Sequence, residues 1–420
     1  MVQKDSQEKK FSTRVISEKF TKEDVHGAIS MPIYRNAAFE FADSKSIEAA
    51  FQYKEEIASH TYTRITNPSV ENLERKIKAA SGAENVMMVA SGMAAISNTF
   101  LTLTYAGGNI VASPHIFGNT FSLFQFTLAA FGVEVRFVNT DNLEEIASAI
   151  DENTCAFFCE LITNPHLEIA NLPEISKILK ARNVPMIVDT TIIPWCGFDA
   201  RKAGVDIEVV STTKYISNGA TSIGGAILDY GTFNWDHNKR LADVAQTDAM
   251  SRFSFKLKRE IARNIGAAMD PETAFLQSLG MESLQLRFEK MSETAYQLAQ
   301  FLSDNKDVVK VGYTKLESSS YKHISDKLIT GNPGAMLTFS LKSKEDCYTF
   351  MDQLQIIRRA TNLFDNKTLI IHPESTIYGT FSPELKEIMG IENNLMRLSV
   401  GLEDISDLQA DILQALEKLN

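Results

Sequence analysis

The sequence Asp206-Ile-Glu-Val-Val-Ser211-Thr-Thr213-Lys214-Tyr215 predicts a buried strand that runs directly into a polar turn. The turn carries the hydroxyl side chains of Ser211 and, two residues on, Thr213, followed by the amine of Lys214. An earlier apolar run, Pro185-Met-Ile-Val-Asp189, predicts a second strand that ends on a carboxylate. Because ligands of open α/β sheets collect outside the carboxyl ends of the strands, we expect these side chains to share one site.

A lysine, two neighbouring hydroxyl groups and a strand-ending aspartate are the groups that an enzyme needs to hold pyridoxal 5′-phosphate (PLP). We expect Lys214 to form the Schiff base and Ser211 and Thr213 to bind the phosphate. Asp189 is expected to pair with the pyridinium nitrogen. The sequence therefore predicts PLP as a cofactor.

Size and charge argue against several classes of protein. A chain of 420 residues, 44% apolar and 23% charged, suits a large α/β domain with a smaller one. The net charge of −11 argues against a sequence-independent nucleic-acid binder, which needs clustered Lys and Arg. No apolar stretch approaches the roughly 18 residues of a membrane span, and the polar residues 1–10 show no secretory signal. We therefore expect a cytoplasmic protein that binds neither nucleic acid nor membrane.

The four cysteines, Cys155, Cys159, Cys196 and Cys347, lack the spacing of a metal site. We expect buried, reduced thiols and no bound metal.

Strand-like and helix-like segments alternate from about residue 69 onward, which predicts the α/β class with a mainly parallel sheet covered on both faces. The expected organisation is an N-terminal arm (1–65), a large α/β domain (66–270) and a C-terminal α+β domain entered through a bridging helix (271–420). Besides the two strands above, the predicted elements are strands at 86–90, 109–113, 133–138 and 156–160 and helices at 92–104, 120–131, 142–150, 173–182 and 271–304.

Ser91-Gly92-Met93 follows a predicted strand and opens a predicted helix. Backbone N–H groups at a helix N-terminus favour a phosphate, and glycine lets the phosphate come close. Taken alone, such a motif is more often a simple helix cap. Its place at the end of a strand, shared with Asp189 and Lys214, favours the phosphate site.

Other candidates leave alternatives open. Asn164, in Glu160-Leu-Ile-Thr-Asn164-Pro165, either binds the ring oxygen of the cofactor or forms a plain Asn-Pro turn. Tyr62 and Arg64 lie either in a surface loop or in an arm that completes the site of a neighbouring subunit. Arg397 interrupts an apolar strand, so it binds either the α-carboxylate of an amino-acid substrate or an internal Asp or Glu.

Taken in order, these motifs resemble the Cys/Met-metabolism family of PLP enzymes, the cystathionine γ-synthase-like group of the aspartate-aminotransferase fold. The resemblance runs from about residue 11 to the end of the chain. It implies PLP-dependent transferase fold type I, with a mainly parallel seven-stranded sheet in the large domain. The matching motifs are Tyr-Thr-Arg-Ile-Thr-Asn-Pro (62–68), Ser-Gly-Met (91–93), Phe-Gly-Asn-Thr (117–120), Val-Asp-Thr-Thr (188–191), Ser-Thr-Thr-Lys-Tyr-Ile (211–216), Thr-Ser-Ile-Gly-Gly (221–225), Leu-Ile-Ile-His-Pro (369–373) and Arg-Leu-Ser-Val-Gly-Leu-Glu (397–403).

The resemblance also implies a role for each matching residue. Lys214 carries the cofactor and moves protons, and Tyr62 is a second catalytic group. Arg397 binds the substrate carboxylate, helped by Asn362 and Leu363. Tyr62 and Arg64 reach the phosphate of an adjacent subunit. The residues implied to hold PLP are Tyr62, Arg64, Ser91, Gly92, Met93, Phe117, Asn164, Asp189, Thr191, Ser211, Thr213 and Lys214.

Two positions depart from the pattern of the family. Phe117 stands where the family has a ring-stacking Tyr, so the acid at the leaving group must be Lys214, Tyr62 or water. Asn362, followed by Leu363 and Phe364, stands where many members have Ser, Leu and Gly, which changes the expected contact with the carboxylate.

The loop after Lys214 indicates the reaction. Its sequence Ala-Thr-Ser-Ile-Gly-Gly (220–225) resembles the O-acetylhomoserine sulfhydrylase subgroup, and so does Phe-Gly-Asn-Thr. The resemblance implies γ-replacement on an O-acylated homoserine by sulfide or a small thiol, giving homocysteine or methionine. The alternatives are a methionine γ-lyase, a cystathionine γ-synthase or lyase, or O-succinylhomoserine as the acyl donor; against a lyase, Asn119 stands where lyases commonly have Cys. The expected assembly is a homotetramer, a dimer of active dimers.

Overall fold

The structure is a computed structural model that describes residues 9–20, 26–52, 60–245 and 250–419. Three parts of the predicted arm, at 1–8, 21–25 and 53–59, lie outside the described residues. The first of them is most of the polar segment 1–10. Among the helices in the described ranges, none combines the length and the apolar character needed to cross a membrane.

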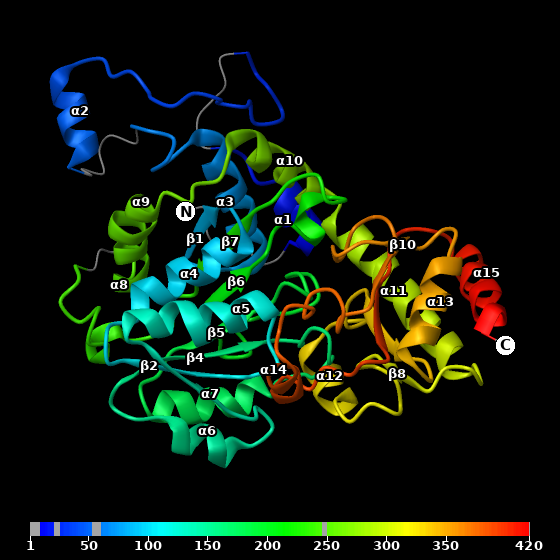
Figure 1. The fold of residues 1–420 in the computed structure, drawn as a ribbon. Coiled ribbons are helices and arrows are strands. Elements are labelled where there is room, and N and C mark those ends of the chain that lie inside the picture. The colour runs from blue at the N-terminus through cyan, green and yellow to red at the C-terminus, as the bar shows by residue number, and fades with distance from the viewer. Residues whose placement is uncertain (1–8, 21–25, 53–59, 246–249, 420) are drawn as a thin grey trace.

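A seven-stranded sheet forms the centre of the larger part of the molecule, with the order β1-β7-β6-β5-β4-β2-β3 (Figure 1). The strands β6, β5, β4, β2 and β3 pair in parallel, whereas β7 is antiparallel to both β1 and β6. The predicted mainly parallel sheet is therefore confirmed, and the carboxyl ends of β1, β6, β5, β4 and β2 share one edge. The strands are β1 (Asn85–Val89), β2 (Asn109–Ala112), β3 (Glu134–Phe137), β4 (Thr154–Glu160), β5 (Met186–Asp189), β6 (Ile207–Val210) and β7 (Gly225–Asp229).

Apolar side chains pack on both faces of this sheet because successive residues of a strand point to opposite sides. Along β5, Ile187 lies in one apolar cluster and Val188 in the other. All four cysteines are free thiols; Cys155, Cys159 and Cys347 are buried and Cys196 is partly buried. The helices of this part are α3 (Pro68–Ser81), α4 (Gly92–Leu103), α5 (Gly118–Ser122), α6 (Leu143–Ala149), α7 (Leu172–Ala181), α8 (Arg252–Lys256) and α9 (Ala262–Ile265).

A second, five-stranded sheet lies in the C-terminal part, with the order β10-β11-β12-β9-β8. In Figure 1 the long helix α11 runs from the first part of the molecule to this sheet, and α13 and α15 lie on the outer side. The elements are α10 (Pro271–Glu282), α11 (Leu284–Ser303), β8 (Lys310–Gly312), α12 (Lys322–Leu328), β9 (Met336–Ser340), α13 (Lys344–Gln353), β10 (Arg358–Arg359), β11 (Leu369–Ile371), α14 (Pro383–Ile388), β12 (Leu395–Ser399) and α15 (Ile405–Leu416).

The N-terminal segment contains two short helices, α1 (Phe11–Ile16) and α2 (Ser44–Phe51). Helix α1 packs against α3, whereas α2 stands away from the body of the molecule (Figure 1). Phe51 and Ile47 of α2 expose 53% and 42% of their surface, so this segment carries apolar side chains that the described part of the chain leaves exposed.

Two predicted helices differ from the structure in detail. The segment 120–131 is helical, but it changes from α5 into a wider π-helical turn over Leu123–Leu128 and ends as a 3₁₀ turn. The predicted bridging helix is two helices, because α10 ends and α11 begins on either side of Ser283.

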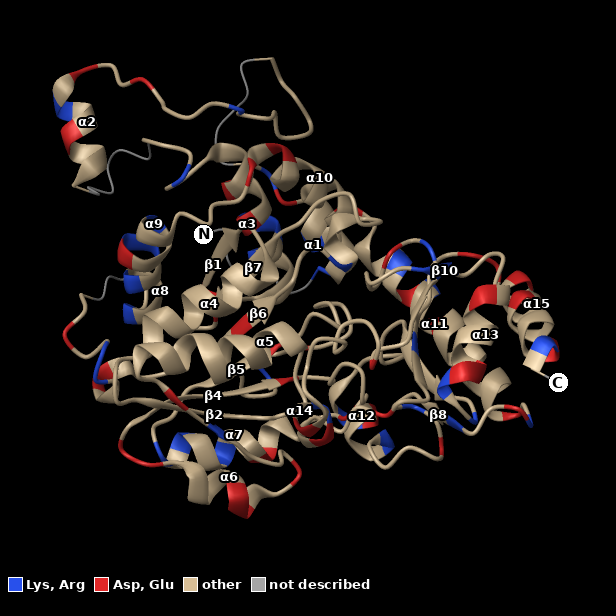
Figure 2. Cartoon of the chain, in the orientation of Figure 1, with Lys and Arg blue, Asp and Glu red and all other residues tan. Residues whose placement is uncertain are grey.

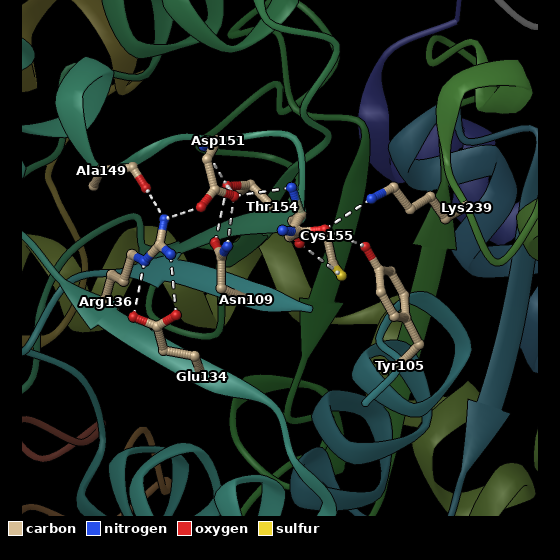
Figure 3. A network of polar contacts seen from close by, with 10 residues as sticks. Tyr105, Asn109, Glu134, Arg136, Ala149, Asp151, Thr154, Cys155 and Lys239 are labelled. Carbon is tan, nitrogen blue, oxygen red and sulfur yellow. Dashed lines mark hydrogen bonds and ion pairs between the residues drawn. The ribbon is translucent and has the colours of Figure 1, made fainter. Parts of the chain in front are cut away.

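A polar network joins the amino-terminal starts of three parallel strands, at the edge opposite the predicted site (Figure 3). Asn109 of β2 donates to Asp151 at 2.8 Å and accepts from the Thr154 hydroxyl of β4 at 2.8 Å. Arg136 of β3 pairs with the same Asp151 at 2.8 Å. The network thus fixes the ends of the strands that lead to the site. Elsewhere, α7 and α13 carry both basic and acidic side chains, whereas the charged side chains of α6 and α15 are all acidic (Figure 2).

Candidate active site

Lys214 lies directly after β6, at the edge where the carboxyl ends of β1, β4, β5 and β6 meet. Its amine Nζ donates a hydrogen bond to Oδ1 of Asn362 at 2.9 Å. Burial and the charge of Arg397 lower the pKa of this amine and Asp189 raises it, with a net value of about 8. Roughly a tenth of the amine is therefore neutral at pH 7, far more than at the ordinary lysine pKa, and the neutral form is the one that a nucleophile or a base requires.

Asp189 ends β5, as the sequence predicts, and pairs across the sheet with Glu160 of β4 and Val209 of β6. Its Oδ1 accepts the backbone N–H of Thr191 at 2.9 Å. Burial raises the pKa of Asp189, while Thr191 and the Lys214 amine lower it. The Thr191 hydroxyl in turn accepts the backbone N–H of Ser211 at 2.8 Å. Asp189 is thus a half-buried carboxylate close enough to Lys214 for their charges to interact.

Helix α4 begins beside the turn after β6. Ser91 caps the helix, because its hydroxyl accepts the backbone N–H of Ala94 at 3.0 Å. A Cβ on Gly92 would lie 2.7 Å from Cβ of Ser211, so only glycine allows this close approach. The backbone N–H groups of Gly92 and Met93, in the first turn of α4, have no acceptor within the helix. The Ser211 side chain and these amides therefore face one small space.

The hydroxyl of Thr213 forms hydrogen bonds with the backbone of Gly224. The hydroxyl donates to the backbone oxygen of Gly224 at 3.2 Å and accepts the N–H of the same residue at 3.0 Å. These bonds hold the loop 217–225 against the turn that carries Lys214.

Arg397 is almost fully buried in β12, with 2% of its surface exposed. Nη1 donates to Oδ1 of Asn164 at 3.1 Å, and Nη2 donates to the backbone oxygen of Thr361 at 3.0 Å. Its Nε is buried and finds no hydrogen-bond partner among the residues that the structure describes, nor does any Asp or Glu in those ranges form an ion pair with Arg397. Burial lowers the pKa of the guanidinium to about 10. The internal salt bridge considered as an alternative is thus not found in the described part of the chain.

Glu160, at the end of β4, is a site residue to which the sequence reasoning gave no role. Its Oε1 accepts the backbone N–H of Phe117 at 2.6 Å, and its Oε2 accepts that of Asn164 at 3.1 Å. Burial, aided by the charge of Asp189, raises its pKa, whereas the backbone N–H groups of Phe117 and Asn164 favour the ionised carboxylate and lower it. The signal in the sequence is a carboxylate that ends an otherwise apolar strand next to the Asp189 strand.

Tyr62 and Arg64 are not brought to Lys214 within one chain. Tyr62 is 43% exposed, and its ring centroid lies 5.5 Å from the Arg64 guanidinium. Arg64 also lines a cavity of about 400 Å³, together with Met88 of β1 and Lys258. Both residues lie at the surface of the described chain.

The side chains around Lys214 fit PLP. The close approach of Gly92 to Ser211 brings the backbone amides that open α4 next to a hydroxyl, and such a set of donors suits a phosphate. Asp189 provides a buried carboxylate that a protonated ring nitrogen would compensate. The unpartnered Nε of Arg397 provides a buried donor for a substrate carboxylate. Together with the sheet order, these groups define a PLP-dependent enzyme of fold type I.

Comparison with known proteins leads to the same class. Residues 12–417 match the family model described as Cys/Met metabolism PLP-dependent enzyme. An O-acetyl-L-homoserine sulfhydrylase 1 of Thermus thermophilus is 34% identical over 92% of this chain and 94% of its own length. An L-methionine gamma-lyase of Fusobacterium nucleatum is also 34% identical, over 95% of this chain and 96% of its own. A crystal structure named as an O-acetylhomoserine (thiol)-lyase of Campylobacter jejuni, with N′-pyridoxyl-lysine-5′-monophosphate, superposes with a TM-score of 0.90 at 32% identity, covering 97% of this chain and 100% of the other. The chain belongs to the Cys/Met metabolism PLP-dependent enzymes.

Proposed function

We propose that the protein catalyses γ-replacement on O-acetyl-L-homoserine with sulfide or a small thiol, giving homocysteine or methionine plus acetate. The observation that carries the proposal is the grouping of Lys214, Asp189 and Arg397 at one edge of the sheet. The choice of substrate is supported by the relatives named O-acetylhomoserine sulfhydrylases. In this reaction the bond between Cγ and the ester oxygen breaks, acetate leaves with the electron pair, and sulfur bonds to Cγ.

Each residue contributes a distinct part of the chemistry. PLP, when bound, supplies an electron sink for the charge that develops as substrate protons leave. Lys214 takes the proton from Cα of the substrate with its neutral amine, and its pKa of about 8 suits both uptake and return of that proton. Asp189 holds the ring nitrogen in its protonated form. Arg397 binds the α-carboxylate, using Nε together with its Nη groups.

The remaining site residues bind and orient. Ser211, with the backbone amides of Gly92 and Met93, holds the phosphate, and Ser91 and Thr191 hold these groups in place. Phe117 would stack on the ring of the cofactor, and Asn362, which accepts from Lys214, would contact the substrate together with Leu363. Thr213, which is bonded to Gly224, would hold its loop beside the phosphate. Asn164, whose Oδ1 accepts from Arg397, would donate its amide to the ring oxygen.

We further propose that two chains share each site. Tyr62 and Arg64, which are exposed at the surface of their own chain, complete the site of a neighbouring subunit as part of an arm spanning residues 1–65. The exposed apolar side chains of α2 support an arm that a second chain covers. Two such dimers would assemble into a homotetramer located in the cytoplasm, with a PLP-binding domain over 66–270 and a second domain over 271–420.

A methionine γ-lyase is the second candidate, because a relative with that name is as similar as a sulfhydrylase. A panel of purified-enzyme reactions separates the two. O-acetyl-, O-succinyl- and O-phosphohomoserine are each incubated with sulfide, and methionine is incubated alone. The proposal predicts homocysteine chiefly from the O-acetyl ester. Release of ammonia and a keto acid from methionine, without homocysteine from any ester, would establish the lyase instead.

A further inference from the structure

Glu160 is a buried carboxylate that the proposed chemistry leaves without a task. Only 5% of its surface is exposed, and it ends β4 directly opposite Asp189 of β5. Each of its two oxygens serves a different loop. Oε1 accepts the N–H of Phe117, in the loop after β2, at 2.6 Å, and Oε2 accepts the N–H of Asn164, in the loop after β4, at 3.1 Å. One carboxylate therefore joins two loops at the active edge of the sheet.

The two loops carry groups with different tasks in the site. The ring of Phe117 comes from the first loop, at the start of α5. The second loop carries Asn164, whose Oδ1 accepts from Nη1 of Arg397 at 3.1 Å. The Glu160 carboxylate thus connects, through Asn164, to the guanidinium in β12 of the other sheet. A shift of the Asn164 loop would therefore reach Arg397, because Asn164 is bonded both to Glu160 and to Arg397.

We propose that Glu160 is a positioning residue whose two carboxylate oxygens fix the Phe117 ring and the Asn164–Arg397 pair in one arrangement. The proposal rests on the proposed function for what Phe117 and Arg397 bind, but the two hydrogen bonds themselves do not depend on it. A carboxylate suits this task because both of its oxygens accept, whereas an amide has one acceptor and one donor. In a glutamine, the NH₂ group would face one of the two backbone N–H groups.

The test compares Glu160→Gln with a matched control, Glu208→Gln. Glu208 is a fully buried carboxylate on β6 of the same sheet, and its oxygens accept from the side chains of Trp195, Tyr230 and Thr190 instead of from the two loops that carry Phe117 and Asn164. The control therefore measures what the loss of a buried carboxylate does to the sheet alone. Glu160→Asp, which keeps two acceptors, replaces Glu160→Gln if the latter does not fold.

The first readout is backbone hydrogen exchange in the cofactor-free protein. We expect about ten-fold faster exchange in peptides covering 115–122 or 161–168 of Glu160→Gln, since one charge-assisted bond is lost, and unchanged exchange there in Glu208→Gln. The second readout is the kinetics of the holoenzyme with O-acetyl-L-homoserine and sulfide, where KM should rise about ten-fold through the loosened Arg397, with a smaller change in kcat.

Equal exchange in the wild type and in Glu160→Gln, or the same acceleration in the Glu208→Gln control, would overturn the positioning role. A wild-type protein that forms no homocysteine would refute the proposed function, yet the exchange experiment would still decide the role of Glu160. The two failures are therefore distinguishable.

Discussion

The amine of Lys214 donates a 2.9 Å hydrogen bond to Oδ1 of Asn362, and this bond joins the two sheets of the molecule at the active edge. Lys214 follows β6 of the first sheet, whereas Asn362 lies between β10 and β11 of the second. Nδ2 of Asn362 is buried and has no hydrogen-bond partner within the described residues. Asn362 is thus placed to hold the lysine amine with its Oδ1 and to offer its Nδ2 group as a donor to a substrate.

Replacing Asn362 by alanine removes both of these contacts. We expect kcat/KM for the acyl-homoserine to fall roughly ten-fold, as for the loss of one hydrogen bond to a charged group. Steady-state kinetics of Asn362→Ala and of Asn362→Ser, the residue that many family members carry, measure the effect. If serine restores most of the activity, a short polar group suffices. An unchanged kcat/KM in Asn362→Ala would show that the bond to Lys214 has no part in turnover.

The lowered pKa of Lys214 predicts an unusual titration in the cofactor-free protein. Competitive labelling with acetic anhydride should give a midpoint of about 8 for Lys214. The midpoint should fall further in Asp189→Asn, because the Asp189 charge favours the ammonium form. The pKa of Lys214 in the folded state lies below its ordinary value of 10.5. The contribution of this group to the free energy of unfolding is therefore greatest above pH 10.5 and is lost as the pH falls through about 8. A midpoint near 10.5 would contradict the burial of the amine.

Glycine at position 92 is required by the packing between α4 and the turn after β6. In Gly92→Ala the new Cβ would meet Cβ of Ser211 at 2.7 Å, so one of the two segments must shift. We expect a loss of about 1–3 kcal/mol in the free energy of unfolding and weaker binding of PLP. Denaturant unfolding and PLP titration measure the two effects. Ser97→Ala, on the same helix, is the control and should leave PLP binding unchanged; equal PLP affinity in Gly92→Ala would argue against a phosphate site here.

Tyr62 should affect catalysis without affecting the fold of its own chain. Its side chain is 43% exposed, so Tyr62→Phe is expected to keep the melting temperature. Because Phe117 has no hydroxyl, loss of the Tyr62 hydroxyl should lower kcat by roughly 10²-fold if it serves as an acid. Tyr34→Phe, in the same arm and 40% exposed, is the matched control. Full activity of Tyr62→Phe would assign the proton transfer to Lys214 or water.

The alternation of apolar strands and helices predicts the main sheet because a buried parallel strand leaves a continuous apolar run, as at Met186–Asp189. Local pattern also places Ser91, Asp189 and Lys214, since Asp189 ends a strand and the other two lie in the turns that follow strands. The partnership of Arg397 with Asn164 could not be predicted, because it depends on how the second sheet docks against the first. The task of Glu160 was missed for the same reason, as its hydrogen-bond partners are backbone groups that sequence does not mark. The break at Ser283 was missed because apolar spacing continues across it.

The most direct test of the proposed function is the formation of homocysteine by the purified, PLP-loaded protein and by its Lys214→Ala variant. Both are incubated with O-acetyl-L-homoserine and sulfide, and the products are identified by mass spectrometry. We predict homocysteine and acetate in equal amounts from the wild type, and loss of product formation in Lys214→Ala. The account would be contradicted if the wild type formed no homocysteine, or if Lys214→Ala formed it as fast as the wild type.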